Sequence, residues 1–218
     1  LMEKTSPDFY DYIIVDEFHH AAADSYQKLL NYYHPKVLLG LTATPERMDG
    51  QSILGWFDGR IAAEIRLPEA IDRKLLAPFQ YFGVTDDIDL SRVKWERGGY
   101  AKQELTNLYT LSGVAAQRRA DAILHAVERY VTDMDDVKAL GFCVSVEHAR
   151  FMTDSFNQAG FPAMSVTGET AESDRTQAKQ RLVSGEIRVI FTVDVYNEGV
   201  DIPEVNTVLF LRPTESLT

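Results

Sequence analysis

Cysteine is almost absent from this sequence, and long apolar runs are absent altogether. The one cysteine, Cys143, lies in an apolar stretch, so neither a disulfide framework nor a thiol cluster for zinc is available. No run of about 18 apolar residues occurs that could span a bilayer, and nothing resembles a secretory signal peptide. We therefore expect a cytoplasmic protein in a reducing compartment, with no membrane partner.

Basic residues are also scarce, since 22 lysines and arginines face 33 aspartates and glutamates, which gives a net charge of −11. The deficit is spread along the chain: residues 1–112 carry 12 basic and 17 acidic side chains, and residues 113–218 carry 10 and 16. Binding to nucleic acid normally draws on clustered lysine and arginine. Any nucleic-acid contact must therefore be local, made by backbone amides, hydroxyls and a few arginines.

Short continuous apolar runs alternate with amphipathic segments along the 218 residues. The runs are typical of strands buried on both faces of a parallel sheet; they are YIIVD, KVLLGLT, ALGFCVS, AMSVTG, RVIFTV and TVLFLRP. Helices are expected over residues 117–131, 147–160 and 173–184, and the last two stop at Gly160 and Gly185. The pattern predicts an α/β fold with doubly wound parallel sheets, in two domains (1–112 and 113–218).

Two carboxylates, Asp16 and Glu17, follow the first apolar run. The carboxyl edge of a parallel sheet is where α/β proteins place ligands. One carboxylate can hold a hydrated Mg²⁺ while its neighbour orients or deprotonates a water, and phosphoryl transfer needs both. Thr42 and Thr44 end the next run and are expected beside Asp16 if the two strands are neighbours. The structural alternatives are a solvated acidic loop and a plain turn at Pro45.

These segments together resemble the superfamily 2 helicases and translocases. DEFH (16–19) looks like their DEAD/DEAH-type Walker B motif, and TAT (42–44) looks like their motif III. TVDVYNEGVDIP (192–203) has the spacing of their motif V. The match runs in order through nearly the whole chain. It implies two RecA-like domains, with a finer similarity to type III restriction subunits and bacterial repair translocases.

The resemblance gives each matching residue of the first domain a role, with ATP and Mg²⁺ as the implied cofactors. Asp16 would hold the metal through water, and Glu17 would act as base or orienting group for the attacking water. His19 would link the ATP site to motif III. Thr42 and Thr44 would couple that site to closure of the two domains.

In the second domain, the resemblance implies that Gly199 lies near the nucleotide phosphates and Asp201 at the ribose hydroxyl. Asp194 would orient an arginine of motif VI. The implied contacts to nucleic acid are Thr192, Thr167, Gly168 and Arg175. DNA is expected rather than RNA, and a nuclease or repair domain is a candidate partner.

Other residues leave alternatives open. Asp16, Glu17, His19 and His20 include good metal ligands, which suggests a metallohydrolase, but a spacing such as H-E-x-x-H is missing. The tryptophans, Trp56 and Trp95, could stack on bases. We expect both to pack in the core or on a helix face instead.

Two elements of the helicase pattern are missing. No G-x-x-x-x-G-K-[ST] loop occurs to cradle phosphates, and no arginine-finger motif follows Arg212, which we interpret as a strand-end arginine. The sequence therefore predicts a piece of a longer helicase, truncated in its first domain at the N-terminus and in its second at the C-terminus. It should be inactive alone. A non-catalytic scaffold of helicase ancestry that binds a protein partner is the alternative.

Overall fold

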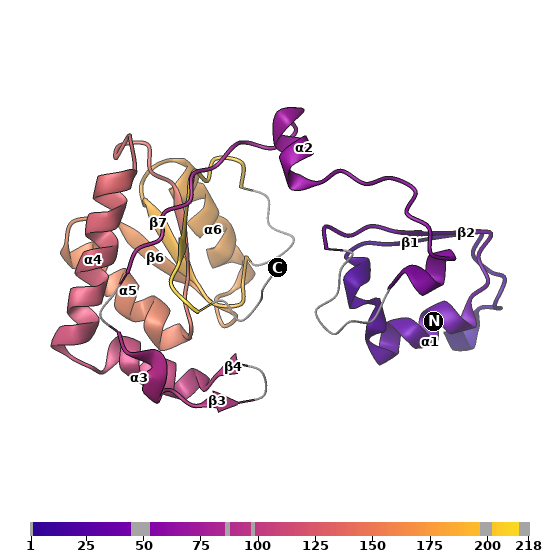
Figure 1. The fold of residues 1–218 in the computed structure, drawn as a ribbon, viewed down its shortest axis with the longest axis horizontal. Coiled ribbons are helices and arrows are strands. Elements are labelled where there is room, and N and C mark those ends of the chain that lie inside the picture. The colour runs from indigo at the N-terminus through magenta and orange to yellow at the C-terminus, as the bar shows by residue number, and fades with distance from the viewer. Residues whose placement is uncertain (1, 45–52, 86–87, 97–98, 197–201, 214–218) are drawn as a thin grey trace. The chain divides into compact units, whose positions relative to one another are not determined.

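The computed structural model describes residues 2–44, 53–85, 88–96, 99–196 and 202–213. Contacts divide the chain into two units, Leu1–Phe79 and Gln80–Leu217 (Figure 1). The domain junction was expected near residue 112, whereas contacts group the chain from Gln80 onward with the second unit. Within the described part of the chain, no helix is long and apolar enough to cross a membrane.

The first unit is built on two parallel strands, β1 (Tyr12–Val15) and β2 (Val37–Gly40). The 3-10 turn η2 (Phe18–Ala22) and helix α1 (Asp24–Tyr32) connect them. In the register, Val15 lies opposite Gly40, so both strands end at one edge. The remaining elements of this unit are η1 (Met2–Lys4), η3 (Ile53–Phe57) and α2 (Leu67–Asp72).

The core of the first unit lies on one face of this strand pair. Its buried members are Val15, Phe18, Ala21, Leu30 and Ile53. The alternate residues of the strands stay exposed, including Ile14 at 65% and Leu39 at 40%. The expected burial of strands on both faces is therefore wrong for the described residues of this unit, because helices cover only one face.

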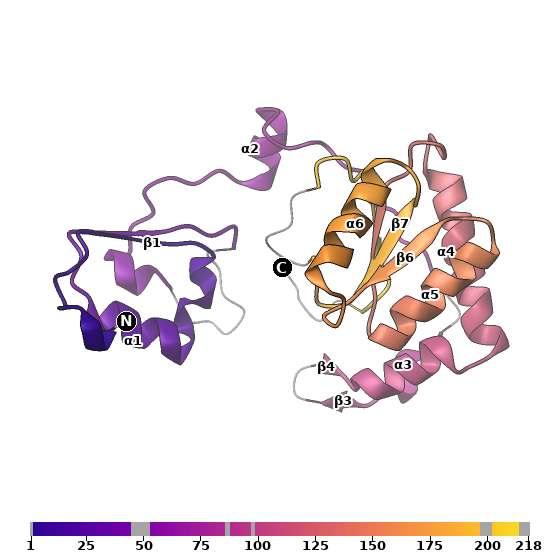
Figure 2. The same cartoon turned by 180° about the vertical axis from the view of Figure 1, so that it is seen from behind.

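The second unit holds a four-stranded parallel sheet in the order β6-β7-β5-β8. The strands are β5 (Ala139–Phe142), β6 (Ala163–Val166), β7 (Val189–Thr192) and β8 (Thr207–Phe210). Helices α4 (Val114–Tyr130) and α5 (Val146–Gln158) cover one face, and α6 (Glu172–Val183) covers the other (Figures 1 and 2). Alternate residues of β7 enter the two cores: Val189 and Phe191 face α4 and α5, while Ile190 faces α6. The doubly wound α/β fold is confirmed here.

The three helices expected from the sequence occur in this unit, and local chemistry explains their ends. Ser145 caps α5 by accepting a hydrogen bond from the amide of His148 at 3.2 Å. Beyond the ends of α5 and α6, Gly160 and Gly185 each have φ of 79°. A residue without Cβ reaches this left-handed conformation at low cost, which stops the helix.

Residues 88–111 form an attachment on the second unit. It contains η4 (Leu90–Arg92), the antiparallel strands β3 (Trp95–Glu96) and β4 (Gly99–Tyr100), and helix α3 (Lys102–Thr110). Leu105 and Tyr109 of α3 are buried in one cluster with Val144, which follows β5. This burial explains why the segment belongs to the second unit.

Candidate functional site

The turn that follows β1 carries Asp16 and Glu17. The amide of Leu41 donates to the carbonyl of Val15 at 2.9 Å, and the amide of Phe18 donates to the carbonyl of Leu41 at 2.8 Å. These bonds hold the turn against the end of β2. Glu17 has left-handed backbone angles (φ 49°, ψ 49°), a conformation that costs a non-glycine residue about 1 kcal/mol. The strand end thus bends the chain sharply between the two carboxylates.

Phe18 anchors this turn from below. Its side chain is fully buried, and its ring meets the ring of Phe57 edge-on, with centroids 4.8 Å apart. The Phe18 ring occupies the space beside Gly40, where a Cβ would lie 2.7 Å from its Cδ2 atom. Phe18, which lies between the acidic residues and the histidines, therefore anchors this turn to the core.

Asp16 and Glu17 differ in the partners of their carboxylates. Asp16 is exposed, and one of its oxygens accepts the amide of Glu17 at 3.0 Å. Oε2 of Glu17 lies 3.3 Å from Nδ1 of His19, and the Glu17 side chain is 42% exposed. A single exposed carboxylate fits Mg²⁺ held through water, since Mg²⁺ keeps several of its waters. The described residues contain no group of three His, Cys, Asp or Glu side chains placed to hold a metal directly, so the metallohydrolase alternative has no ligand set there.

His19 connects the acidic turn to the end of β2. Its Nδ1 lies 3.0 Å from the hydroxyl of Thr42, and the same hydroxyl accepts the amide of Thr44 at 3.1 Å. The prediction that Thr42 lies on the same edge as Asp16 is confirmed by the parallel register, but the hydroxyl contacts His19. One ring nitrogen thus faces both a carboxylate and a hydroxyl. With a proton on Nδ1 it can donate to either, and without one it can only accept from the Thr42 hydroxyl.

At the corresponding edge of the second unit, the chain after β7 is tightly folded. Thr192 is fully buried, and its hydroxyl donates to the carbonyl of Val195 at 2.8 Å. Asp194 and Tyr196 have positive φ values of 53° and 67°. In the structure Thr192 shapes this turn, and its contact with a phosphate stays a prediction. Gly199 and Asp201 lie outside the described residues.

Asp194 forms ion pairs with two basic side chains. Its Oδ2 lies 3.2 Å from Nζ of Lys102 on α3, and its Oδ1 lies 3.4 Å from Nη1 of Arg212 after β8. Arg212 was expected to be a strand-end arginine, and the structure gives it this partner. Exposed pairs of this kind stabilise a fold by less than about 1 kcal/mol. Their effect here is to join three segments at the carboxyl edge of the sheet.

The turn after β6 contains Thr167 and Gly168, and Arg175 organises it. The guanidinium donates to the carbonyls of Thr170 and Gly168, both at 2.9 Å, and to that of Thr167 at 3.3 Å. The amide of Glu169 donates to the Thr167 hydroxyl at 3.3 Å. Gly168 is exposed, with nothing within 4 Å of the position a Cβ would take. The backbone at Gly168 is therefore accessible from outside the turn, while Arg175 supports the turn from inside.

An open cavity of about 620 Å³ lies at this edge. It is bordered by the end of β6, the start of α5 and the turn after β7. Its lining includes Lys102, Ser145, Arg150, Gly168 and Asp194. Of these, Gly168 and Asp194 come from the motif match, whereas Lys102, Ser145 and Arg150 have no motif spacing that could have identified them.

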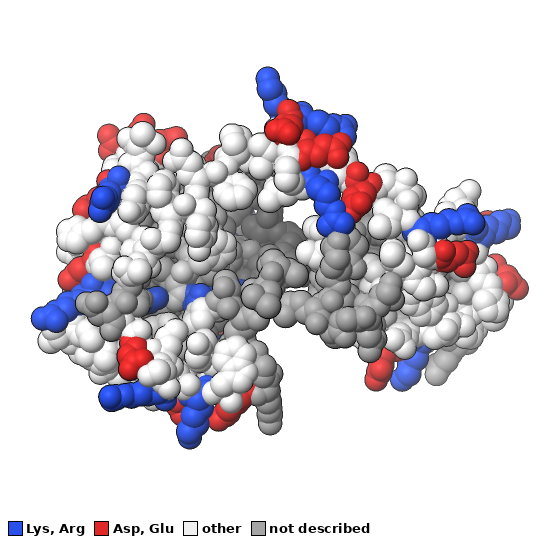
Figure 3. Space-filling model, in the orientation of Figure 1, with Lys and Arg blue, Asp and Glu red and all other residues white. Residues whose placement is uncertain are grey.

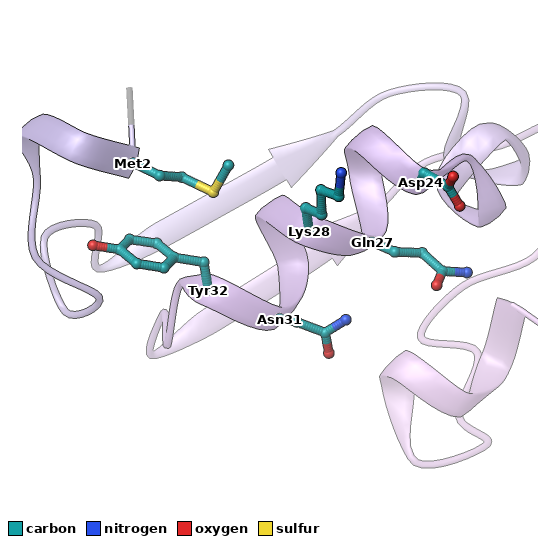
Figure 4. Close-up of a pocket in the computed structure, with 6 residues that line it drawn as sticks. All are labelled: Met2, Asp24, Gln27, Lys28, Asn31 and Tyr32. Carbon is teal, nitrogen blue, oxygen red and sulfur yellow. The ribbon is translucent and has the colours of Figure 1, made fainter.

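A second cavity, of about 600 Å³, lies in the first unit along α1. Figure 4 shows it lined by Met2, Asp24, Gln27, Lys28, Asn31 and Tyr32. The Tyr32 hydroxyl is already committed, donating to the carbonyl of Thr5 at 2.7 Å. No residue predicted from the sequence lines this cavity, so it is separate from the acidic turn.

Charges are mixed on the face shown in Figure 3. There lysine and arginine side chains lie among aspartate and glutamate, and neither sign forms a broad field.

Comparisons with known proteins match a described family to a segment of each unit. Residues 2–47 match the family described as "Type III restriction enzyme, res subunit", and residues 122–218 match "Helicase conserved C-terminal domain". A 51.5 kDa protein of a Lactococcus phage is 32% identical over 94% of this chain and 43% of its own length. The DNA 3'-5' translocase XPB2 of Sulfurisphaera tokodaii is 24% identical over 91% of this chain and 51% of its own length.

The fold of the chain is similar to that of a solved helicase domain. The Hef helicase domain of Pyrococcus furiosus aligns with a TM-score of 0.54 and 13% identity, covering 97% of this chain and 67% of that one. At this identity the likeness concerns the fold alone, and it is a RecA-like α/β fold. The chain spans about half or less of the length of the two relatives described above.

Proposed function

The chain belongs to the superfamily 2 helicases, of the type III restriction-like kind, and we propose that it forms part of an ATP-driven motor that moves along DNA. The single observation that carries this proposal is the turn after β1. There Asp16 and Glu17 are presented at a strand end, and His19 joins them to Thr42. A solvated acidic loop would need neither the buried anchor at Phe18 nor a histidine between the two strand ends.

In this proposal the acidic turn serves ATP hydrolysis. Asp16 would hold Mg²⁺ through water, because its carboxylate is exposed and keeps one oxygen clear of the Glu17 amide. Bound Mg²⁺ would neutralise charge that develops on the phosphates. Glu17 would orient the attacking water and take its proton. Gly199 and Asp201, by their motif position, would contact the phosphates and the ribose.

Coupling between hydrolysis and movement would pass through His19. Its Nδ1 faces both Glu17 and Thr42, so a change in the hydrogen bonding of the carboxylate can alter the bond to the β2 end. Thr44 would follow, because its amide donates to the same hydroxyl. In the second unit, Asp194 would orient the arginine of motif VI. The pair between its carboxylate and the guanidinium of Arg212 supports this role, because Asp194 already contacts an arginine there.

DNA would run along the carboxyl edge of the second sheet. Gly168 offers an exposed backbone without a side chain, and Arg175 fixes the turn that presents it. Thr167 and Thr192 would shape this surface or contact phosphates directly. The name of one relative, a DNA translocase, is the support for DNA as the nucleic acid. The match to a restriction subunit supports a nuclease or repair domain as partner.

This sequence has no phosphate-binding loop of the G-x-x-x-x-G-K-[ST] type. The hydrolytic activity would therefore belong to a longer protein that supplies this loop and an arginine finger. Arginine fingers alone contribute roughly 10³–10⁵ in rate in related systems. We expect no measurable ATP turnover by the 218-residue chain on its own.

The test is Glu17→Gln in a longer protein that contains this chain and a phosphate-binding loop. We expect ATP binding to be retained and hydrolysis to fall by about 10²–10⁴, as for loss of a general base. Glu69→Gln is the matched control, because Glu69 makes only an exposed pair with Arg73 on α2. Near-normal turnover in the Glu17 variant would refute the proposed role, and the scaffold alternative would then be preferred.

A further inference from the structure

A small hairpin, β3 and β4, carries an exposed tryptophan. Trp95 pairs with Tyr100 in the antiparallel register, and the two rings meet at 80° with centroids 5.0 Å apart. The residue remains 59% exposed. The expectation that both tryptophans pack is therefore wrong for Trp95, whereas Trp56 packs against the core of the first unit. Tryptophan is enriched at interfaces, where its large ring supplies contact area.

The hairpin is firmly attached, so this exposure is a built feature. The amide of Ala101 donates to the carbonyl of Lys94 at 2.7 Å, and the amide of Lys94 donates to the Glu104 carboxylate at 2.9 Å. Val93 and Tyr100 pack against the cluster that holds Leu105 and Tyr109. Figure 1 shows the hairpin lying beside α3. These bonds and contacts tie the hairpin strands to α3, while the ring of Trp95 stays exposed.

The sequence around this tryptophan is richer in basic residues than the chain as a whole. Residues 92–102 include four basic side chains and one acidic side chain, whereas the whole chain has a net charge of −11. The side chains of Lys94 and Lys102 are 72% and 61% exposed, and each forms an exposed ion pair, with Glu104 and Asp194 respectively, that a phosphate can replace. Lysines flanking an exposed aromatic ring are the combination that binds single-stranded nucleic acid, the cations at phosphates and the ring on a base.

The hairpin also stands next to the edge at which we propose that DNA runs. Tyr100 ends β4, and Lys102, two residues later, pairs with Asp194 beyond β7. The same lysine lines the cavity that includes Gly168. A strand that passes Gly168 therefore finds the basic hairpin as the continuation of its path.

From these observations we infer that residues 92–96 and 99–102 form a contact for single-stranded nucleic acid, in which a base stacks on the ring of Trp95. The inference rests on the proposed function and adds to it a residue that lies between the segments matched by the two family models. Single strands are the expected ligand because bases inside a duplex are already stacked on each other. Stacking needs only an aromatic face, so little sequence preference is expected.

The experiment uses the 218-residue chain with Trp56→Phe, which leaves Trp95 as its single tryptophan. Titration with an oligothymidylate at low salt should quench the emission of Trp95. An abasic oligomer of equal length offers the same phosphates without bases, so it should bind without this quenching. Fluorescence anisotropy of end-labelled oligomers measures binding independently, in the range of about 10⁻⁴–10⁻⁶ M expected for non-specific contacts.

Substitutions complete the test. Trp95→Ala should weaken binding of the oligothymidylate roughly five- to 150-fold, and Trp95→Phe should restore much of the loss. Tyr81→Ala is the matched control, because Tyr81 is also exposed (78%) but has no basic neighbour in sequence. Far-UV circular dichroism checks that each variant is folded.

Binding that is unchanged in Trp95→Ala and leaves Trp95 unquenched would overturn the inference and would leave the proposed motor function intact. Absence of binding of the 218-residue chain to any oligomer would overturn the inference, and the proposed function would still be decided by Glu17→Gln in the longer protein. If instead Trp95 is quenched while Glu17→Gln leaves ATP hydrolysis normal in the longer protein, the inference stands and the proposed function fails.

Discussion

Replacement of Gly40 by alanine is expected to disturb the acidic turn from beneath. Gly40 ends β2, and a Cβ there would lie 2.6 Å from Cζ of Phe57 and 2.7 Å from Cδ2 of Phe18. Both distances are shorter than real Cβ contacts. Because Phe18 is fully buried, its ring can move only by displacing its neighbours. The residues on either side of it, Glu17 and His19, would move with it.

Two opposing effects set the magnitude. Overpacking a filled core costs about 1–3 kcal/mol. Alanine in place of glycine gains about 0.4–1 kcal/mol by restricting the unfolded chain. The first effect is larger, so we expect Gly40→Ala to lose about 1–2 kcal/mol of unfolding free energy. With a urea dependence of about 1–2 kcal/mol per M for a small unit, the midpoint should fall by roughly 1 M.

The assay is urea unfolding followed through Trp56, in a Trp95→Phe background. Trp56 packs against the same cluster as Phe18 and Phe57, so its fluorescence reports on the first unit. Gly55→Ala is the control, because a Cβ at Gly55 meets nothing within 4 Å; it should be neutral or stabilising by up to about 1 kcal/mol. If Gly40→Ala is as stable as Gly55→Ala, the argument from close packing is refuted.

Two further predictions concern the second unit. Burial, together with the nearby Arg119 guanidinium, lowers the pKa of His148 from 6.5 to about 3. Below pH 6.5 His148 therefore binds a proton in the unfolded chain but stays neutral in the folded chain. The free energy of unfolding should fall as the pH drops from about 6.5 toward 3. Urea midpoints at pH 5, 6 and 7 should show a weaker pH dependence in His148→Gln; an equal slope would contradict this. Burial also raises the pKa of the Cys143 thiol, which is 1% exposed. A thiol reagent should modify Cys143 only in urea, and rapid modification of the native chain would contradict its burial.

Much of the fold could be predicted from the sequence because its causes are local. Apolar runs and amphipathic periods placed the strands and helices of the second unit, and Gly160 and Gly185 marked two helix ends. The division of the chain was harder to predict. Residues 80–112 have weak periodicity, and only the burial of Leu105 and Tyr109 against Val144 showed which unit they join.

The candidate site was determined in the same two stages. The sequence by itself put Asp16, Glu17 and Thr42 at one sheet edge, since parallel strands end together. Only the tertiary structure decided that Thr42 meets His19, that Arg175 bonds the carbonyls of its own turn, and that Trp95 faces outward. The physical reason is that spacing along a strand fixes the edge that a residue reaches. Which donor then meets which acceptor depends on the packing of side chains far apart in the sequence.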